Sequence, residues 1–319
     1  MKKRKIEKSS PHEKGKWMEG LKKDFLREKQ LWIISAFALL FILVFYIVPM
    51  LGNYMAFIDY KPRKSIFETD FVGLKHFRKF FSLPDVWKVI RNTLVMGGLN
   101  ITIGFAAPII LALMLNELRV KSLKRVVQTV SYLPHFVSWV VVASITLSLF
   151  STEGVVNELL VKTGILDQPF GFVTNGSTYW VFITVLNLWK TVGWSSIIYM
   201  SAIAGVDQEL YEAGAVDGLG RWGMVRHITI PGISSTIIML FILGAGGIIN
   251  GGFEQHLLLG TATTREFYET IDTYVYRYGL EMGQYSFATA VSLLKGVISI
   301  VLVLLTNWLS GKWSDTSVF

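Results

Sequence analysis

Four polar or aromatic side chains share one face of an apolar stretch in the second half of the chain. Asn187, Lys190, Thr191 and Trp194 occupy positions i, i+3, i+4 and i+7, which lie on one side of a helix. Asparagine and lysine can hydrogen-bond hydroxyl groups, and an indole ring can cover the C–H face of a sugar. The face could therefore contact a ligand rich in hydroxyl groups, or it could hold helices together, because hydrogen bonds between membrane helices select the same residue types.

Three other residues carry similar chemistry with less support. Lys295 shares its helix face with two serines, Trp139 follows a Pro-His pair by a few residues, and Asn250 stands among several glycines. Gly247 and Gly251 have the GxxxG spacing of closely packed membrane helices. Glycine-broken spans also line binding sites in transporters, so packing and substrate contact are both open at Asn250.

Several other chemistries find no support in the sequence. The chain contains no cysteine, its five histidines are scattered, and no G-x4-G-K-[ST] phosphate loop occurs. Residues 218–223 match G-x-G-x-x-G, but no predicted strand precedes them. Asn100 and Asn175 fit the glycosylation triplet, which is short enough to arise by chance. No nucleophile, base and orienting acid can be grouped, so an enzyme is not predicted.

Six apolar stretches must position these side chains. Hydrophobic residues make up 52% of the 319 residues, and a membrane-spanning helix needs about 20 apolar residues. We expect an all-α polytopic membrane protein, with a basic cytoplasmic extension at 1–29 and one transmembrane domain at 30–319. The predicted spans are Leu31 to Val48, Thr93 to Leu115, Val126 to Phe150, Trp180 to Ile203, Ile233 to Ile249 and Phe287 to Leu309.

The lysines and arginines of the chain are distributed unevenly between the two sides of the six predicted spans. The formal net charge is +8, and lysine and arginine are more numerous on the side that holds both termini, which favours cytoplasmic termini. The stretch GLKHFRKFF at 73–81 interleaves cations with aromatics, as an interfacial segment does. We therefore expect contact with a lipid bilayer and no binding of nucleic acid.

A polar insert at 205–232 separates the fourth and fifth predicted spans. A hairpin between two membrane helices needs only a few residues, so this length is in excess. Asp207 can cap a helix, and Ala215, Leu219 and Trp222 would form the apolar side of that helix. The insert could rest on the bilayer as an amphipathic hairpin, or it could transmit motion from a partner. Periodicity alone does not choose between them.

The insert also carries a gapped motif. Glu212-Ala213-Gly214, then Gly218, then Ile228-Thr229-Ile230-Pro231 resemble the EAA-x3-G-x9-I-x-L-P motif of ABC importer permeases. Gly214 replaces the second alanine of that motif, and Ile230 replaces its leucine. Similarity to the sugar-permease branch of type I importers continues in GLKHF at 73, YLPHFVSWVVV at 132 and GQYSFATAVSLLKG at 283. It looks closest to permeases for oligosaccharides or polysaccharide fragments.

The resemblance implies a type I ABC importer permease (MetI-like) fold with six transmembrane helices in a bacterial cell membrane. In that family the EAA loop forms a coupling helix on a cytoplasmic ATPase, a second permease completes a heterodimer, and an extracytoplasmic solute-binding protein delivers the carbohydrate. ATP and Mg would be bound by the ATPase, and we expect no cofactor or metal on this chain. The implied coupling residues are Glu212, Ala213, Gly214, Asp217, Gly218, Arg221, Ile228 and Pro231.

Two other functions compete with this interpretation. A secondary transporter driven by an ion gradient would need carboxylates buried in its spans, and the six apolar stretches contain none. A non-transporting membrane scaffold would leave two features without a role: the polar helix face around Lys190 and the spacing of the EAA motif. The candidates for the substrate pathway are Asn187, Lys190, Trp194, Asn250, Lys295 and Trp139.

Overall fold

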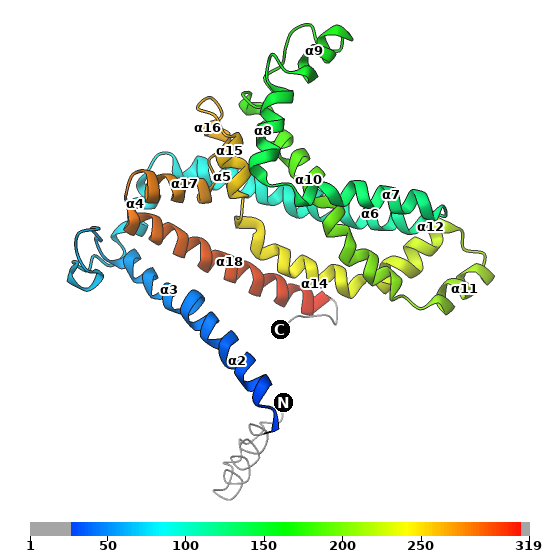
Figure 1. The fold of residues 1–319 in the computed structure, drawn as a ribbon, viewed down its shortest axis with the longest axis horizontal. Coiled ribbons are helices and arrows are strands. Elements are labelled where there is room, and N and C mark those ends of the chain that lie inside the picture. Colours follow the sequence, from blue (N-terminus) through cyan, green and yellow to red (C-terminus); the bar gives the residue numbers. More distant parts are fainter. Residues whose placement is uncertain (1–26, 314–319) are drawn as a thin grey trace, which may run out of the picture. The chain divides into compact units, whose positions relative to one another are not determined.

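The structure, a computed structural model, describes residues 27–313, which are almost entirely helical (Figure 1). An isolated antiparallel bridge between Ile58 and Phe71 is the one strand-like feature among these residues. Contacts divide the chain into two units, one up to Tyr54 and one from Met55 onward. The predicted extension at 1–29 lies almost entirely outside the described residues.

A long apolar helical run begins in the first unit and ends three residues past its boundary at Tyr54. It consists of α2 (Lys29–Ile42), the π-helical turn η1 (Leu43–Ile47) and α3 (Val48–Met50), continued by the 3-10 turn η2 (Leu51–Phe57). No charged residue occurs after Lys29 in this run. Its 29 residues are enough to cross a bilayer. The predicted span from Leu31 to Val48 is confirmed and extends further at its end.

Four candidate spans of the second unit follow the predicted order among the described residues. The first, Val86–Glu117, is built from α5 (Val86–Leu99), the π-helical turn η4 (Asn100–Gly104) and α6 (Phe105–Glu117). The others are Trp139–Lys162, built from α8 (Trp139–Phe150) and α9 (Val155–Lys162), then α10 (Gly176–Ala204), and α18 (Tyr285–Trp313) up to Lys312.

The predicted third span, Val126 to Phe150, is wrong at its start. Residues Lys121–Tyr132 form a separate helix, α7, which ends in the 3-10 turn η5 (Leu133–Phe136). Pro134 lies in this turn, and Ser138 begins α8 by accepting a hydrogen bond from the Val141 N–H. α7 therefore packs along α6 and α10 instead of continuing into α8 (Figure 1).

The fifth predicted span is bent near its beginning. A helical run of α12 (Arg221–Met224), η6 (Val225–Thr229) and α13 (Ile230–Gly232) meets a second run of α14 (Ser234–Ala245) and η7 (Gly246–Ile249) at 61°. If this pair is one span, the described residues contain six spans, as predicted, and otherwise they contain five. The all-α polytopic fold is confirmed.

Short helices gather where α5, α10 and α18 begin. They are α4 (Lys75–Ser82), which follows the turn η3 (Ile66–Glu68), and then α15 (Phe253–Leu259), α16 (Arg265–Tyr268), α17 (Ile271–Tyr276) and η8 (Arg277–Glu281). A buried cluster around Tyr274 and Phe287 joins several of them to α5 and α18. Another cluster, around Tyr199 and Ile233, joins α6, α10 and α14 at the opposite end of α10.

Candidate functional site

The polar insert begins as a short capped helix, α11 (Gln208–Val216). Asp207 precedes it, and its carboxylate accepts a hydrogen bond from the Glu209 backbone N–H at 3.0 Å. This is the cap that the sequence predicted. α10 ends at Ala204, so only three residues separate the end of the span from the start of α11.

The helix of the insert ends earlier than its apolar periodicity suggested. Gly218 has a φ of +78°, a left-handed conformation that favours glycine. The Leu219 N–H bonds to the Gly214 carbonyl at 2.9 Å, which closes the helix end. Leu219 and Trp222 therefore do not continue the helix face that carries Ala215, and the predicted apolar side formed by these three residues is wrong.

The inner face of α11 packs directly on η6. Gly214 is buried, and a Cβ atom there would lie 2.8 Å from Cδ1 of Ile228 and 3.0 Å from Sδ of Met224. The hydroxyl of Tyr211 lies 2.9 Å from Oγ1 of Thr229, which is itself buried. Glycine at 214, where the motif has alanine, thus lets α11 and η6 approach closely.

The opposite face of the insert has no partner within the described chain. Val216 is 88% exposed and Trp222 is 75% exposed, so large apolar side chains stand open beside the exposed charged groups of the insert. The motif residues lie on both faces of the insert. On the inner face Gly214 is buried and Ile228 is half-buried. Glu212, Ala213, Asp217, Gly218, Arg221 and Pro231 are exposed.

The insert is anchored to three spans. Val206, Tyr211 and Ile228 join the buried cluster that contains Tyr199 of α10 and Ile233 at the bend before α14. Close packing of this kind moves as a unit, because interiors are as dense as organic crystals. A cavity of about 350 Å³ lies beside it, lined by the ends of α6 and α10 together with residues of α11 and α12. The insert is therefore a rigid extension of the membrane helices.

A polar pair joins two spans near their midpoints. The Asn187 side-chain amide of α10 donates a hydrogen bond to Oδ1 of Asn100 at 3.1 Å. Asn100 begins η4, and π-helical turns often mark functional sites. The sequence singled out Asn187 but dismissed Asn100 as a chance glycosylation triplet. Its position inside an apolar stretch was the signal that could have identified it.

Lys190 lies one turn further along α10 and is only 7% exposed. Its ammonium group donates to the carbonyl oxygen of His135 at 2.8 Å and approaches that of Pro134 at 3.4 Å. Both carbonyls belong to η5, between α7 and α8. A Cβ atom at Gly193 would lie 2.0 Å from the Ser131 carbonyl oxygen, so α7 meets α10 backbone to backbone here. Lys190 thus supplies donors to carbonyls at the break between α7 and α8.

Aromatic rings surround the same break. The Trp194 ring stacks on His135 with centroids 4.6 Å apart and planes 3° from parallel. The Lys190 ammonium lies 5.7 Å from the centroid of Trp139. The structure therefore brings Lys190, Trp194 and Trp139 together. Trp194 remains 44% exposed, so one face of the group is open.

The other two pathway candidates lie elsewhere. Lys295 of α18 forms an ion pair with Asp272 of α17. Asn250 is exposed between η7 and α15, and neither residue forms a hydrogen bond or ion pair with the Lys190 group within the described residues. A Cβ atom at Gly251 would lie 2.8 Å from Thr270, whereas Gly247 faces open space. The two glycines thus do not form one packing face.

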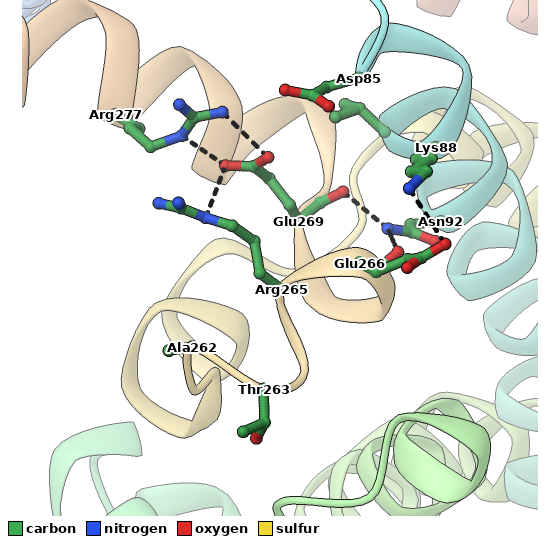
Figure 2. A pocket seen from close by; sticks show the side chains of 10 residues that line it. Asp85, Lys88, Asn92, Ala262, Thr263, Arg265, Glu266, Glu269 and Arg277 are labelled. Carbon is green, nitrogen blue, oxygen red and sulfur yellow. Dashed lines mark hydrogen bonds and ion pairs between the residues drawn. The ribbon is translucent and has the colours of Figure 1, made fainter.

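A charged cavity of about 340 Å³ lies at the beginning of α5, near the end of α10 that is far from the insert. We call it the outer cavity. The sequence did not reveal it, because Asn92 and Glu266 are 174 positions apart. Its polar lining comes from two segments and consists of Asp85, Lys88, Asn92, Thr263, Arg265, Glu266, Glu269 and Arg277 (Figure 2).

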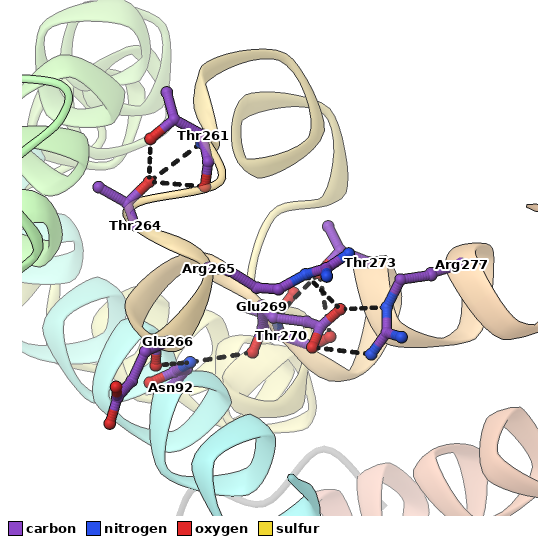
Figure 3. Close-up of polar contacts among 9 residues, drawn as sticks. All are labelled: Asn92, Thr261, Thr264, Arg265, Glu266, Glu269, Thr270, Thr273 and Arg277. Carbon is purple, nitrogen blue, oxygen red and sulfur yellow. Dashed lines mark hydrogen bonds and ion pairs between the residues drawn. The ribbon is translucent and has the colours of Figure 1, made fainter.

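The floor of the outer cavity is a buried ion pair. The Arg277 guanidinium donates to the Glu269 carboxylate through Nε at 2.6 Å and Nη2 at 3.0 Å, and Glu269 is only 6% exposed. Nε of Arg265 lies 3.9 Å from the same carboxylate. The buried Asn92 side chain donates to the carbonyl oxygens of Glu266 and Glu269 at 2.9 and 3.0 Å (Figure 3). These contacts fasten the segment around α16 to α5.

The segment around α16 is also fastened to α10. The Trp180 indole N–H of α10 donates to the Phe267 carbonyl oxygen at 2.8 Å, and the Thr93 hydroxyl of α5 accepts from the Ile271 N–H at 2.9 Å. No group of three or more residues that could hold a metal ion occurs among residues 27–313. The hydrogen bonds of Trp180 and Thr93 attach the cavity to two spans. The groups available there for binding are charged side chains and an amide.

His256 of α15 is a third buried attachment. Its Nε2–H donates to the Gly251 carbonyl oxygen at 2.8 Å, because a carbonyl can only accept. Nδ1 is then left to accept from the Tyr179 hydroxyl of α10 at 3.1 Å. Burial lowers the pKa of His256 to about 4, so the ring is neutral and both its nitrogens are satisfied.

Comparison with known proteins agrees with this architecture. The family model described as "Binding-protein-dependent transport system inner membrane component" matches residues 104–314. The chain is 40% identical to Protein LplB of Bacillus subtilis (strain 168), over 95% of this chain and 94% of that protein. It is 41% identical to the "Polygalacturonan/rhamnogalacturonan transport system permease protein YteP" of the same organism, over 92% and 91% of the two chains.

A solved structure is similar in fold as well as in sequence. A chain of the "bacterial alginate ABC transporter in complex with alginate pentasaccharide-bound periplasmic protein" superposes with a TM-score of 0.85 at 37% identity. The similarity covers 93% of this chain and 99% of that one.

Proposed function

Because this chain belongs to the family of binding-protein-dependent transport system inner membrane components, we propose that it is a permease subunit of an ATP-driven ABC importer for carbohydrates. The cargo class is oligosaccharides or polysaccharide fragments. Support for that class comes from relatives whose names specify polygalacturonan, rhamnogalacturonan and alginate transport. The chain would form half of the translocation pathway and would itself be non-catalytic.

The observation that carries this proposal is the two-sided insert at 205–232. Its inner face is buried against α6, α10 and α14, while Glu212, Val216 and Trp222 on the rest of its surface are exposed. A surface of charged and apolar side chains on a rigid base is suited to docking on another protein. We infer that the docked protein is a cytoplasmic ABC ATPase, which binds ATP and Mg.

Two further partners follow from the same proposal. A second permease subunit would complete the pathway as a heterodimer, and an extracytoplasmic solute-binding protein would deliver the carbohydrate. The alginate transporter structure, whose description includes a periplasmic protein with bound pentasaccharide, supports the second of these partners. The importer would lie in a bacterial cell membrane with both termini of this chain in the cytoplasm.

The pathway residues that we propose keep the sequence candidates and add one. Asn187 and its partner Asn100 provide amide groups near the middle of two spans. Trp194 and Trp139 provide ring faces close to Lys190, although the Lys190 ammonium already has carbonyl partners within the chain. Lys295, paired with Asp272, and Asn250 would contribute only at the far end of the spans.

The test is a charge reversal on the exposed face of α11. Glu212→Lys in the assembled importer should abolish uptake of the carbohydrate and reduce the amount of ATPase that co-purifies in mild detergent. Membrane insertion should be unchanged, because Glu212 makes no hydrogen bond or ion pair among the described residues. Glu68→Lys is the matched control, since Glu68 is also exposed but lies in η3, outside the candidate spans.

Full retention of the ATPase together with normal uptake in Glu212→Lys would contradict the docking role of α11. Loss of the ATPase in the Glu68→Lys control as well would show that the assay reports general charge effects and not this surface.

A further inference from the structure

The outer cavity contains a buried ion pair that stability alone does not explain. Burying two charges costs desolvation free energy that their attraction often fails to recover. Glu269 and Arg277 nevertheless form the cavity floor with a two-point contact, and Asn92 fixes the backbone of Glu269 from α5. Such a preorganised polar floor is typical of a recognition site in which side chains are held before the ligand arrives.

Across residues 27–313, the groups on the wall leave one carboxylate without a partner and one cation with only a long ion pair. Lys88 pairs with Glu266 at 3.2 Å. The Asp85 carboxylate makes no hydrogen bond or ion pair within the described part of the chain, and Arg265 reaches Glu269 only at 3.9 Å, beyond hydrogen-bonding distance. Asp85 and Arg265 line the same cavity on either side of Glu269 (Figure 2).

The balance of charge restricts the ligand. Three cations and three carboxylates line the cavity. A free phosphate would be attracted by Arg265 but repelled by the carboxylates, and a small cation would be attracted by the carboxylates but repelled by the basic side chains. A carboxylate only accepts hydrogen bonds and a guanidinium only donates them. Hydroxyl groups do both, so a polyhydroxylated ring can satisfy Asp85 and Arg265 together. The volume of about 340 Å³ is within the range of small-molecule sites.

We propose that the outer cavity is a saccharide subsite that holds one or two glycosyl units of the cargo. This inference rests on the proposed function, because it assigns a carbohydrate contact to a carbohydrate permease. Asp85 accepts hydrogen bonds from ring hydroxyls, Arg265 donates to hydroxyl or carboxylate oxygens, and the pair of Glu269 and Arg277 keeps the floor in place. The subsite lies at the end of α10 opposite the insert at 205–232, and Trp180 attaches it to that helix.

The experiment is a binding titration on the full-length chain in lipid nanodiscs. The probes are trigalacturonate, maltotriose and inorganic phosphate, and isothermal titration calorimetry measures their binding. A trisaccharide should bind, phosphate should not, and Asp85→Asn and Arg265→Gln should each raise the dissociation constant at least tenfold. The matched control is Lys162→Gln, which removes an exposed cation paired with Glu158 outside the cavity and should bind like the original chain.

Failure of both trisaccharides to bind would overturn the subsite, as would unchanged affinity in both cavity variants. Competition between phosphate and the trisaccharide would overturn it in favour of an anion site. Thermal unfolding of each variant identifies a folding defect. If Asp85→Asn proves unstable, the dissociation constant of Arg265→Gln decides the test. Co-purification of the ATPase does not involve this cavity, so the proposed function is tested separately.

Discussion

Removing the Lys190 ammonium should destabilise the membrane domain by a measurable amount. In Lys190→Met the side chain keeps a similar length but loses its donors to the carbonyl oxygens of His135 and Pro134. The Pro134 carbonyl still accepts from the Val137 N–H at 3.2 Å, so the loss falls on the His135 carbonyl, and a buried carbonyl without a partner costs about 1–3 kcal/mol. Hydrogen bonds between membrane helices are worth about 0.6 kcal/mol on average and reach about 1.7 kcal/mol. We therefore expect a loss of about 1–2 kcal/mol.

That loss can be read from thermal unfolding of the purified chain in detergent micelles. A change of about 1 kcal/mol shifts the melting temperature of a domain of 150–250 residues by about 2–4 °C, so Lys190→Met should melt about 2–8 °C lower. Lys162→Met is the matched control, because Lys162 is exposed and its pair with Glu158 spans one helical turn. An exposed pair of this kind contributes well under 1 kcal/mol, so the control should melt almost unchanged.

The same comparison separates two roles of Lys190. If its main role is to hold the break between α7 and α8, Lys190→Met melts lower and uptake falls with the amount of assembled importer. If the ammonium instead contacts the cargo, uptake per assembled importer falls while the melting temperature stays within 1 °C of the original. The second result would refute the carbonyl-holding role.

Two shorter predictions concern close packing and pH. Gly214→Ala should change stability very little, because the flexible side-chain ends of Ile228 and Met224 can move aside. Gly214→Val should overpack the contact of α11 with η6 and lower stability by about 1–3 kcal/mol. It should also reduce the amount of ATPase retained in detergent pull-downs. His256 stays neutral in the folded chain down to its pKa of about 4, while the unfolded chain takes up this proton near pH 6.5. Stability should therefore fall between about pH 6.5 and 4, by up to about 3 kcal/mol, and His256→Gln should flatten the melting temperature over that range.

Much of the architecture could be predicted from the sequence because bilayer thickness imposes a length on every span. Apolar runs of about 20 residues leave few alternatives, and Asp207 signals the start of α11 by local chemistry alone. The error at residues 121–138 has a local cause. The apolar residues of α7 merge with those of α8 in a hydropathy count, and only Pro134 and Ser138 mark the break.

The contacts of the candidate sites could not be predicted in the same way. Lys190 stood out as a cation in an apolar stretch, but its partner carbonyls lie 55 and 56 positions earlier in the chain. They meet it only because Gly193 lets α7 approach α10. The outer cavity combines residues from α5 with residues near α16, and no periodic pattern connects these segments. Tertiary packing, and not local propensity, decides such meetings.

α10 connects the sites of this chain in one element. Its 29 residues contain no proline, and at about 1.5 Å per residue they extend about 43 Å. Trp180 near one end is bonded to the segment that bounds the outer cavity, Asn187 and Lys190 contact η4 and η5 near the middle, and the other end leads within three residues into α11. A displacement of α11 cannot be absorbed inside an uninterrupted helix whose contacts are close-packed. Because Val206 and Tyr211 pack with Tyr199 of α10 in one buried cluster, such a displacement should be carried along α10 to the polar groups near mid-membrane, as the proposed coupling of an ATPase to the opening of a pathway requires.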